Sequence, residues 1–264
     1  MLGLKDNDLV RETAGIYDFS VSTVIGDRAE QQDSFAFLLQ PNRAFVAICD
    51  GMGGHRGGKL AGKLAARTML EACSGASDDD PVSLLQRAAE LADRKISQLT
   101  DESGARMNAG STLSSVLLLG RTLYWCAIGD SRIYLLRGDE FVQLTQDQNY
   151  KTVLNAQLHT GAITQEEYDR NLYRADALIS FIGIGNLKLV DYNQRPFTLE
   201  PKDKLILMSD GVYRVLPEEE IKSVIMNFSN PADALQMLEY KIQKEAKKNK
   251  RSRDNTTAAI LKIL

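Results

Sequence analysis

The sequence is poor in the residues that bind transition metals or build disulfide frameworks. It has three cysteines and two histidines among 264 residues. Cys49 and Cys126 lie inside apolar runs, where a small thiol is usually buried, and no Cys-x-x-Cys spacing occurs. Neither His55 nor His159 has a partner at ligand spacing, which excludes a His-rich zinc site. We therefore expect buried free thiols and a reducing, cytoplasmic location.

Long apolar runs and an excess of positive charge are also missing. No apolar segment approaches the length of a membrane span, and the first residues lack the charged-then-apolar pattern of a signal peptide. The formal net charge is -3, which gives no general reason to expect nucleic-acid binding. We expect a monomer that binds neither nucleic acid nor membrane.

The sequence does contain short strand patterns in runs and helix patterns in pairs. Strands are expected at residues 16–25, 34–39, 44–49, 112–119, 122–128, 132–136, 140–144, 187–193, 204–208 and 255–264. Helices are expected at residues 58–73, 82–99 and 231–248, with another that starts at Pro217. Short connections between the strands in the middle of the chain force antiparallel neighbours. This pattern predicts an α+β protein with antiparallel sheets covered by helices.

Residues 147–185 differ from the rest of the chain. They are polar, have no strong core period, and carry Glu166, Glu167 and Asp169 in a short helical pattern. We interpret the segment as a flap with one or two helices, because long excursions from compact domains are usually functional or disordered. We find no internal repeat and no low-complexity linker, so residues 1–264 are expected to form a single domain.

Five aspartates stand where an apolar, strand-like run meets a loop. They are Asp33, Asp50, Asp130, Asp210 and Asp254. A carboxylate at the end of a buried strand is costly unless a cation or a hydrogen-bond donor meets it, so we expect the five to converge. Carboxylates without nearby cysteine or histidine ligands favour hard cations such as Mg²⁺ or Mn²⁺. The sequence therefore predicts metal-assisted chemistry on an anionic substrate, with a phosphate as the best candidate.

The most specific segment is residues 50–58, in which five glycines follow Asp50. A glycine-rich loop between a strand and a helix often binds phosphate through backbone N–H groups. A dinucleotide-binding fingerprint does not fit, because no acidic residue ends a second strand about 20 residues further on. Asp50 would repel a bare phosphate, so we expect a cation between the two. A plain flexible turn would explain two glycines but not five.

Six motifs occur in order along the chain. They are Arg28-Ala-Glu-Gln-Gln-Asp33, Asp50-Gly-Met-Gly-Gly-His55, Gly110-Ser-Thr112, Gly129-Asp-Ser-Arg132, Ser209-Asp-Gly211 and Asp254-Asn255. The set resembles the bacterial form of the metal-dependent PPM (type 2C) serine/threonine protein phosphatases, over residues 16–264. The resemblance implies a four-layer α-β-β-α sandwich, with two antiparallel sheets between helix pairs and a flap segment.

The resemblance also implies a role for each motif aspartate. Asp50 would bridge two metal ions, Mn²⁺ or Mg²⁺, and the carbonyl group of Gly51 would bind one of them. Asp210 and Asp254 would complete the ligand shell of the second ion. Asp130, together with Asp210, would hold a third and weaker metal ion.

Two further residues would act on water and on substrate. Asp33 would support the waters at the metal ions, and Arg28 would clamp the phosphate, since its planar fork can donate two hydrogen bonds. Two divalent ions about 3.5–4 Å apart lower the pKa of a shared water, which would attack phosphorus directly without a phosphoenzyme. The implied substrates are phosphoserine and phosphothreonine on proteins, formed by a Ser/Thr kinase.

The chain departs from the family pattern at several positions. Gln31 stands where asparagine is usual, Ile179-Ser180 replace Thr-Arg, and Met52 stands where many eukaryotic members have histidine. His55 lies three positions further on and is expected to be a loop residue, with water as the proton source. These departures leave one alternative open, namely a catalytically weak module that recognises phosphate or regulates a partner.

A second alternative is an esterase of the Gly-Asp-Ser kind, because Ser131 follows Gly129-Asp130. Such an enzyme needs a histidine after the serine. Only His159 follows Ser131, and Ala156 stands where an aspartate would precede that histidine. We therefore rank the esterase below the phosphatase.

Overall fold

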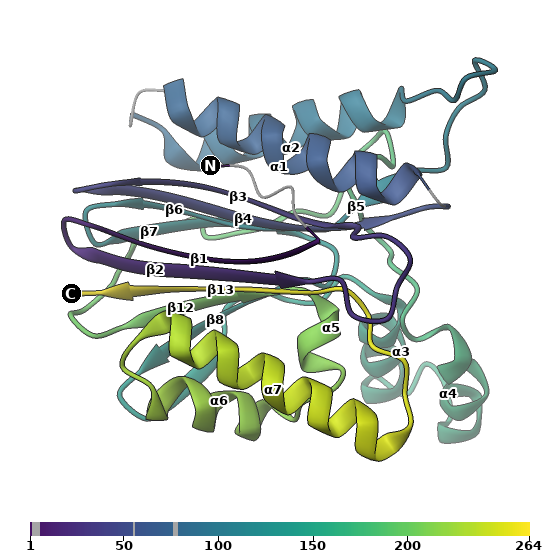
Figure 1. Ribbon diagram of the computed structural model, residues 1–264. Coiled ribbons are helices and arrows are strands. Elements are labelled where there is room, and N and C mark those ends of the chain that lie inside the picture. The colour runs from purple at the N-terminus through teal and green to yellow at the C-terminus, as the bar shows by residue number, and fades with distance from the viewer. Residues whose placement is uncertain (2–5, 55, 76–78) are drawn as a thin grey trace.

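Two antiparallel sheets lie face to face between two pairs of helices (Figure 1). The computed structural model describes residue 1 and residues 6–54, 56–75 and 79–264. Three clusters of buried apolar side chains fill the layer boundaries: one under each helix pair and one between the sheets. The predicted α+β sandwich of four layers is confirmed.

The first sheet has seven strands, and its central strand leads to the candidate site. The order is β10-β7-β6-β4-β3, with β11 paired to β7 and β5 paired to β4. The bounds are β3 Asp33–Gln40, β4 Arg43–Met52, β5 Gly110–Ser111, β6 Leu113–Leu119, β7 Thr122–Ile128, β10 Asp191–Tyr192 and β11 Phe197–Thr198. Residues 44–49 of β4 are all buried, so the chain leaves the core at Asp50.

The second sheet has six strands and packs on the first. Its order is β1-β2-β13-β12-β8-β9. The bounds are β1 Asn7–Ala14, β2 Tyr17–Val24, β8 Arg132–Arg137, β9 Glu140–Gln143, β12 Lys204–Met208 and β13 Thr256–Ile263. Side chains such as Phe19, Phe37, Val46 and Leu261 fill the space between the sheets. Every residue of β12 is buried, as expected for a strand with a packed layer on each face.

A helix pair covers the outer face of each sheet (Figure 1). Helices α1 Gly57–Gly75 and α2 Pro81–Ser97 pack on the first sheet, and α6 Glu218–Asn227 and α7 Pro231–Asn249 pack on the second. Asp80 caps α2, because its carboxylate accepts a hydrogen bond from the third residue of the helix at 3.1 Å. No helix in the described part of the chain is long and apolar enough to span a membrane.

The flap segment, residues 147–185, contains short helices, as expected. They are α3 Tyr150–His159, α4 Gln165–Asn171 and the 3-10 helix η1 Leu172–Arg174. The segment returns to the core at Asp93 on α2, which is 3% exposed. The Asp93 carboxylate accepts hydrogen bonds from the N–H groups of two glycines of the segment, at 2.7 and 3.0 Å. The C-terminal end of the flap segment is therefore attached to α2.

Several parts of the strand pattern differ from the expectation, which also lacks the two-residue strands β5 and β11. The sequence pattern does not predict β1, because this edge strand is mostly exposed and lacks a strong apolar alternation. The prediction of a strand at residues 187–193 is wrong for most of that range, because only the two-residue strand β10 forms there. The Asn193 side chain replaces a backbone partner: its Oδ1 accepts a hydrogen bond from the Trp125 N–H at 2.8 Å, and its amide donates to the Leu123 carbonyl at 2.9 Å.

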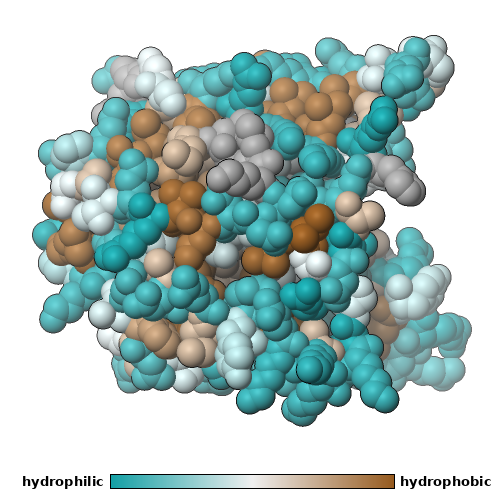
Figure 2. Space-filling model, viewed as in Figure 1, coloured by the Kyte–Doolittle hydropathy of each residue, from teal (hydrophilic) through white to brown (hydrophobic). Residues whose placement is uncertain are grey.

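The molecular surface on one face is mostly hydrophilic (Figure 2). Apolar residues on this face form separate groups among hydrophilic ones. A broad apolar patch would mark an obligate interface, and this face does not show one.

Candidate metal centre

A cavity of about 540 Å³ lies at one end of the sandwich, where elements of both sheets meet. Four of the five predicted aspartates line it, namely Asp50, Asp130, Asp210 and Asp254. Asp50 lies on β4 and Asp130 follows β7 in one sheet, whereas Asp210 follows β12 and Asp254 precedes β13 in the other. Folding thus brings together carboxylates that are far apart in the sequence.

Asp33, the fifth aspartate, is buried next to this group. It is 5% exposed and stands opposite Asp50 in the register of β3 and β4. The Ser209 hydroxyl donates a hydrogen bond to its carboxylate at 2.8 Å, and its backbone N–H donates to the side-chain oxygen of Gln31 at 3.0 Å. The Gln31 amide donates to the Thr23 hydroxyl at 2.9 Å. Gln31 stands where the family usually has asparagine. Its longer side chain is held through both the oxygen and the nitrogen of its amide group.

Close packing of the backbone explains the glycine after Asp50. A Cβ atom at Gly51 would lie 2.0 Å from the carbonyl oxygen of Gly58 and 2.8 Å from that of Gln32. Thr112 holds the backbone of Asp50 through two hydrogen bonds. The Thr112 hydroxyl accepts a hydrogen bond from the Asp50 N–H at 3.0 Å, and the Thr112 N–H donates one to the Asp50 carbonyl at 2.8 Å. The backbone thus holds Asp50 and Gly51 in the cavity wall.

Arg28 lines the same cavity and contacts one of the aspartates. Its Nη2 atom lies 2.6 Å from Oδ2 of Asp254, and 58% of its side chain is exposed. Asn255 fastens the loop that carries Arg28: its side chain accepts the Gln32 N–H at 2.8 Å and donates to the Glu30 carbonyl at 3.1 Å. The arginine predicted to bind phosphate therefore lies beside the predicted metal ligands.

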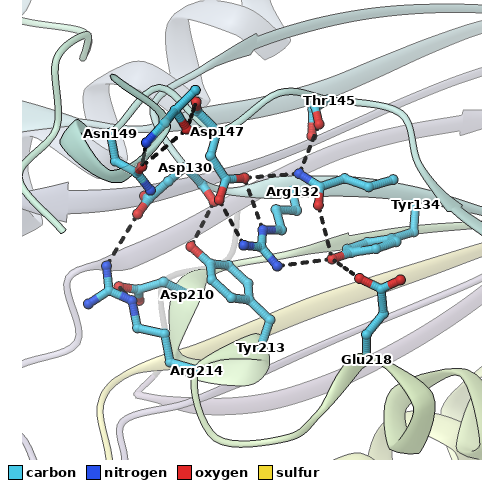
Figure 3. A network of polar contacts seen from close by, with 12 residues as sticks. Asp130, Arg132, Tyr134, Thr145, Asp147, Asn149, Asp210, Tyr213, Arg214 and Glu218 are labelled. Carbon is cyan, nitrogen blue, oxygen red and sulfur yellow. Dashed lines mark hydrogen bonds and ion pairs between the residues drawn. The ribbon is translucent and has the colours of Figure 1, made fainter. Parts of the chain in front are cut away.

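A second arginine lies between the remaining two aspartates (Figure 3). Arg214 follows the short helix α5 Asp210–Tyr213 and contacts Asp130 at 3.2 Å and Asp210 at 3.0 Å. It also contacts Asp176 of the flap segment at 3.3 Å. Neither Arg214 nor Asp176 was among the residues predicted for the site. An arginine four positions after an aspartate is a helical pairing pattern that points to Arg214, whereas no sequence signal links Asp176 to the site.

The carboxylates of this centre carry more negative charge than the two arginines balance. Burial, with a further contribution from Asp210, raises the pKa of Asp33 to about 7 and the pKa of Asp130 to about 6. Burial, and next the charge of Asp33, also raise the pKa of Asp50 well above its usual range. Both causes disfavour the ionised forms, and a bound cation would relieve both.

The donor set fits hard divalent cations. The side chains are carboxylates, and the lining residue Glu30 has a buried carboxylate oxygen without a hydrogen-bond partner among the described residues. The described residues do not already form a compact metal-binding group of three or more His, Cys, Asp or Glu side chains. In this arrangement Nη2 of Arg28 bonds only one oxygen of Asp254, so the carboxylate keeps acceptor sites for a cation.

The residues of the esterase alternative do not form a catalytic pair. Ser131 is 3% exposed, and its hydroxyl lies 2.7 Å from that of Thr112. His159 ends α3 on the exposed surface of the flap segment. Met52 lines the cavity, whereas His55 lies outside the described residues. The serine after Asp130 is therefore a packing residue.

Comparisons with known proteins identify the family of this chain. The family model described as protein phosphatase 2C matches residues 23–252. Protein phosphatase PhpP of Streptococcus pneumoniae is 27% identical over 226 residues, which are 84% of this chain and 89% of that protein. The serine/threonine phosphatase stp of Listeria monocytogenes is 30% identical over 194 residues, which are 72% of this chain and 74% of that protein.

Solved structures show the same fold. The Mycobacterium tuberculosis phosphatase PstP/Ppp superposes with a TM-score of 0.76 at 23% identity, over 94% of this chain and 98% of that chain. A structure of the PstP catalytic domain with two manganese ions gives a TM-score of 0.73 at 23% identity, over the same shares. The family model and the curated relatives identify a protein phosphatase. This chain belongs to the protein phosphatase 2C family, as its motifs predict.

Proposed function

We propose that this protein hydrolyses phosphoserine and phosphothreonine on protein substrates with two divalent ions, Mn²⁺ or Mg²⁺, in the cavity. One observation carries the proposal: Asp50, Asp130, Asp210 and Asp254 come from both sheets and line one cavity together with Arg28. So many carboxylates would repel a phosphate monoester without cations between them. The cavity therefore suits metal-dependent chemistry on phosphate.

The aspartates are proposed to have two different roles, namely to bind the metal ions and to orient water. In the proposal, Asp50 and the carbonyl group of Gly51 would help to hold the ions, and Asp210 and Asp254 would complete the ligand set of the second ion. When bound, such ions lower the pKa of a water and offset the charge of the phosphate. Asp33, whose carboxylate is held by a buried hydroxyl at 2.8 Å, orients water beside them.

Arg28 is proposed to orient the phosphate. Its guanidinium is largely exposed and has one carboxylate partner, Asp254. Phosphate oxygens can replace that partner through two parallel hydrogen bonds, which a guanidinium donates in the geometry that phosphate accepts.

The lining of the cavity supports direct attack by water. Its described residues include no cysteine, histidine or lysine, and their only hydroxyl group is that of Thr112. Thr112 is 2% exposed, and its hydroxyl already bonds to Ser131 and to the N–H of Asp50. Among the described lining residues, cysteine, histidine and accessible hydroxyl nucleophiles are thus missing, which supports direct attack by water over a phosphoenzyme on one of these residue types.

The setting of the reaction is also a proposal. We infer a single domain over residues 1–264 with a flap at residues 147–185, a monomeric cytoplasmic enzyme, and substrates phosphorylated by a Ser/Thr kinase. The three cysteines are buried free thiols, which supports a reducing compartment. The mostly hydrophilic face in Figure 2 supports a monomer.

Phosphate release tests the proposal directly. Purified protein should release inorganic phosphate from an aryl phosphate and from a phosphoserine peptide only with Mn²⁺ or Mg²⁺, and a chelator should stop both reactions. A catalytically weak recognition module would bind the phosphopeptide without releasing phosphate. An esterase would instead cleave an aryl acetate with no need for metal. Either of these two results would overturn the proposed phosphatase activity.

A further inference from the structure

The Arg214 guanidinium contacts three carboxylates, each through a different nitrogen. Nε lies 3.0 Å from Asp210, Nη2 lies 3.2 Å from Asp130, and Nη1 lies 3.3 Å from Asp176. Asp130 and Asp210 are the two residues for which the sequence resemblance implied a third metal ion. The position expected for an ion is thus taken by a side chain of the protein itself (Figure 3).

The carboxylates around Arg214 need a cation of some kind. The Asp130 side chain is 5% exposed and the Asp210 side chain is 15% exposed, so water screens their repulsion only weakly. A divalent ion could meet this need only when it is bound. A guanidinium meets it at all times, because arginine remains charged in proteins and is covalently attached.

Residues next to Arg214 hold the loop of Asp130, one of its partners, in place. The hydroxyl of Tyr213, the preceding residue, donates a hydrogen bond to the backbone carbonyl of Asp130 at 2.9 Å. The guanidinium of Arg132 lies 3.6 Å from the centre of the Tyr213 ring and makes two hydrogen bonds to Asp147, at 2.9 and 2.7 Å. The end of α5 and the loop of Asp130 are therefore tied together before any ligand binds (Figure 3).

We infer that Arg214 is a built-in cation that takes the place of a third metal ion and ties the flap segment to the floor of the cavity. The inference rests on the proposed two-metal function and revises the expectation of a third ion at Asp130. Asp176 supplies the flap contact, since it follows η1 within residues 147–185 and its side chain is 71% exposed. This centre would thus work with two exchangeable ions and one fixed positive charge.

Counting bound manganese tests the first part of the inference. The wild-type chain should bind two Mn²⁺ ions in equilibrium dialysis with metal analysis. Arg214→Asp removes the fixed charge and adds a fourth carboxylate, so this variant should bind three. Three ions on the wild type would overturn the inference, and so would two ions on Arg214→Asp.

Melting of the metal-free protein tests the second part without using metal binding. Arg214→Gln leaves three carboxylates without their cation, so its melting temperature should fall by roughly 6–10 °C. Arg67→Gln is a matched control, because Arg67 makes an exposed ion pair with Glu71 at the same spacing of four residues, on α1. The control should change the melting temperature by roughly 1 °C or less.

The two measurements separate this inference from the proposed function. A wild type that bound no manganese would defeat the two-metal function, whereas the metal-free comparison would still decide whether Arg214 is the built-in cation. An Arg214→Gln protein that melts at the wild-type temperature or above it, without metal, would overturn the inference. A fall no larger than that of Arg67→Gln would do the same.

Discussion

The two sides of the acidic cavity balance their charge in different ways. On one side, Arg28 donates to a single carboxylate, that of Asp254, and 58% of its side chain is exposed. On the other side, Arg214 contacts three carboxylates at once and is 39% exposed. A substrate phosphate can therefore replace the single carboxylate partner of Arg28. No single ligand can replace the three carboxylate partners of Arg214.

The difference follows from the positions of the two arginines in the chain. Arg28 lies in the loop between β2 and β3, whereas Arg214 directly follows α5 and has the Tyr213 contact to the Asp130 loop behind it. An exposed ion pair contributes about 0–1 kcal/mol to stability, whereas removing the cation from buried carboxylates costs about 3–5 kcal/mol. We therefore expect Arg28 to act on substrate and Arg214 to act on charge balance.

Asp50→Asn should have the largest effect on activity, because it removes a charge from the side that is to hold two ions. We expect the rate of phosphate release to fall by roughly a thousandfold and manganese affinity to weaken. Steady-state kinetics at saturating manganese, with calorimetry of metal binding, would measure both. Wild-type turnover in Asp50→Asn would mean that the Arg28 side of the cavity is not a metal site.

Arg28→Ala should reduce kcat/KM by roughly 10–100-fold and leave manganese binding nearly intact, because the exchange partner of Arg28 is the substrate. Arg28→Lys should recover only part of the loss, since an ammonium group cannot donate in a planar fork. Phosphopeptide kinetics and calorimetry check both statements. If Arg28→Ala abolished manganese binding, Arg28 would be a structural residue like Arg214. The proposed difference in role between the two arginines would then be wrong.

Asp33→Asn should stabilise the metal-free protein at high pH. The folded-state pKa of about 7 lies above the unfolded value of about 3.9, so the folded state binds more protons between them. Stability is therefore full below about pH 4 and is lost as the pH rises through about 7. Asparagine does not ionise, so the variant keeps the free energy of unfolding that the wild type loses as the pH rises. The variant should therefore be more stable than the wild type by about 1–3 kcal/mol at pH 8, and equally stable or less stable at pH 5.

Urea unfolding of both metal-free proteins at pH 5 and pH 8 measures this difference. The same difference at both pH values would contradict a raised pKa at Asp33. Saturating manganese provides the control, because bound ions should reverse the order at pH 8 and make the wild type the more stable protein.

His55→Ala should have the smallest effect. Met52 lines the cavity at the position where the resemblance places histidine in many eukaryotic members, and water is expected to protonate the leaving group. We expect turnover of an aryl phosphate and of a phosphoserine peptide to change by less than about tenfold, well below the roughly 10²–10⁴-fold of a positioned acid. A large loss confined to the phosphopeptide would identify His55 as the acid.

The sequence predicted the site best where function and backbone geometry depend on the same short segment. Asp50 and Gly51 stand together in the chain, and the close approach of Gly58 explains why glycine is needed there. The central strands were equally clear, because continuous burial leaves a continuous apolar run, as in β12. The assignment of each aspartate to a metal ion stays a prediction.

The features that the sequence did not predict depend on contacts between distant segments. Asp176 meets Arg214 only because the flap segment folds back over α5, and no local pattern encodes that return. The strand pattern at residues 187–193 was misleading, since apolar residues also occur in a loop whose hydrogen bonds come from the Asn193 side chain. Both cases are tertiary effects that override local preference.

The account is tested most directly by measuring phosphate release from a phosphoserine peptide against the number of manganese ions bound per wild-type chain. We predict no release without manganese, a maximum when two ions are bound, and no further gain at higher concentration. Full activity without metal, or activity that keeps rising until a third ion binds, would contradict a centre with two exchangeable ions beside a fixed Arg214.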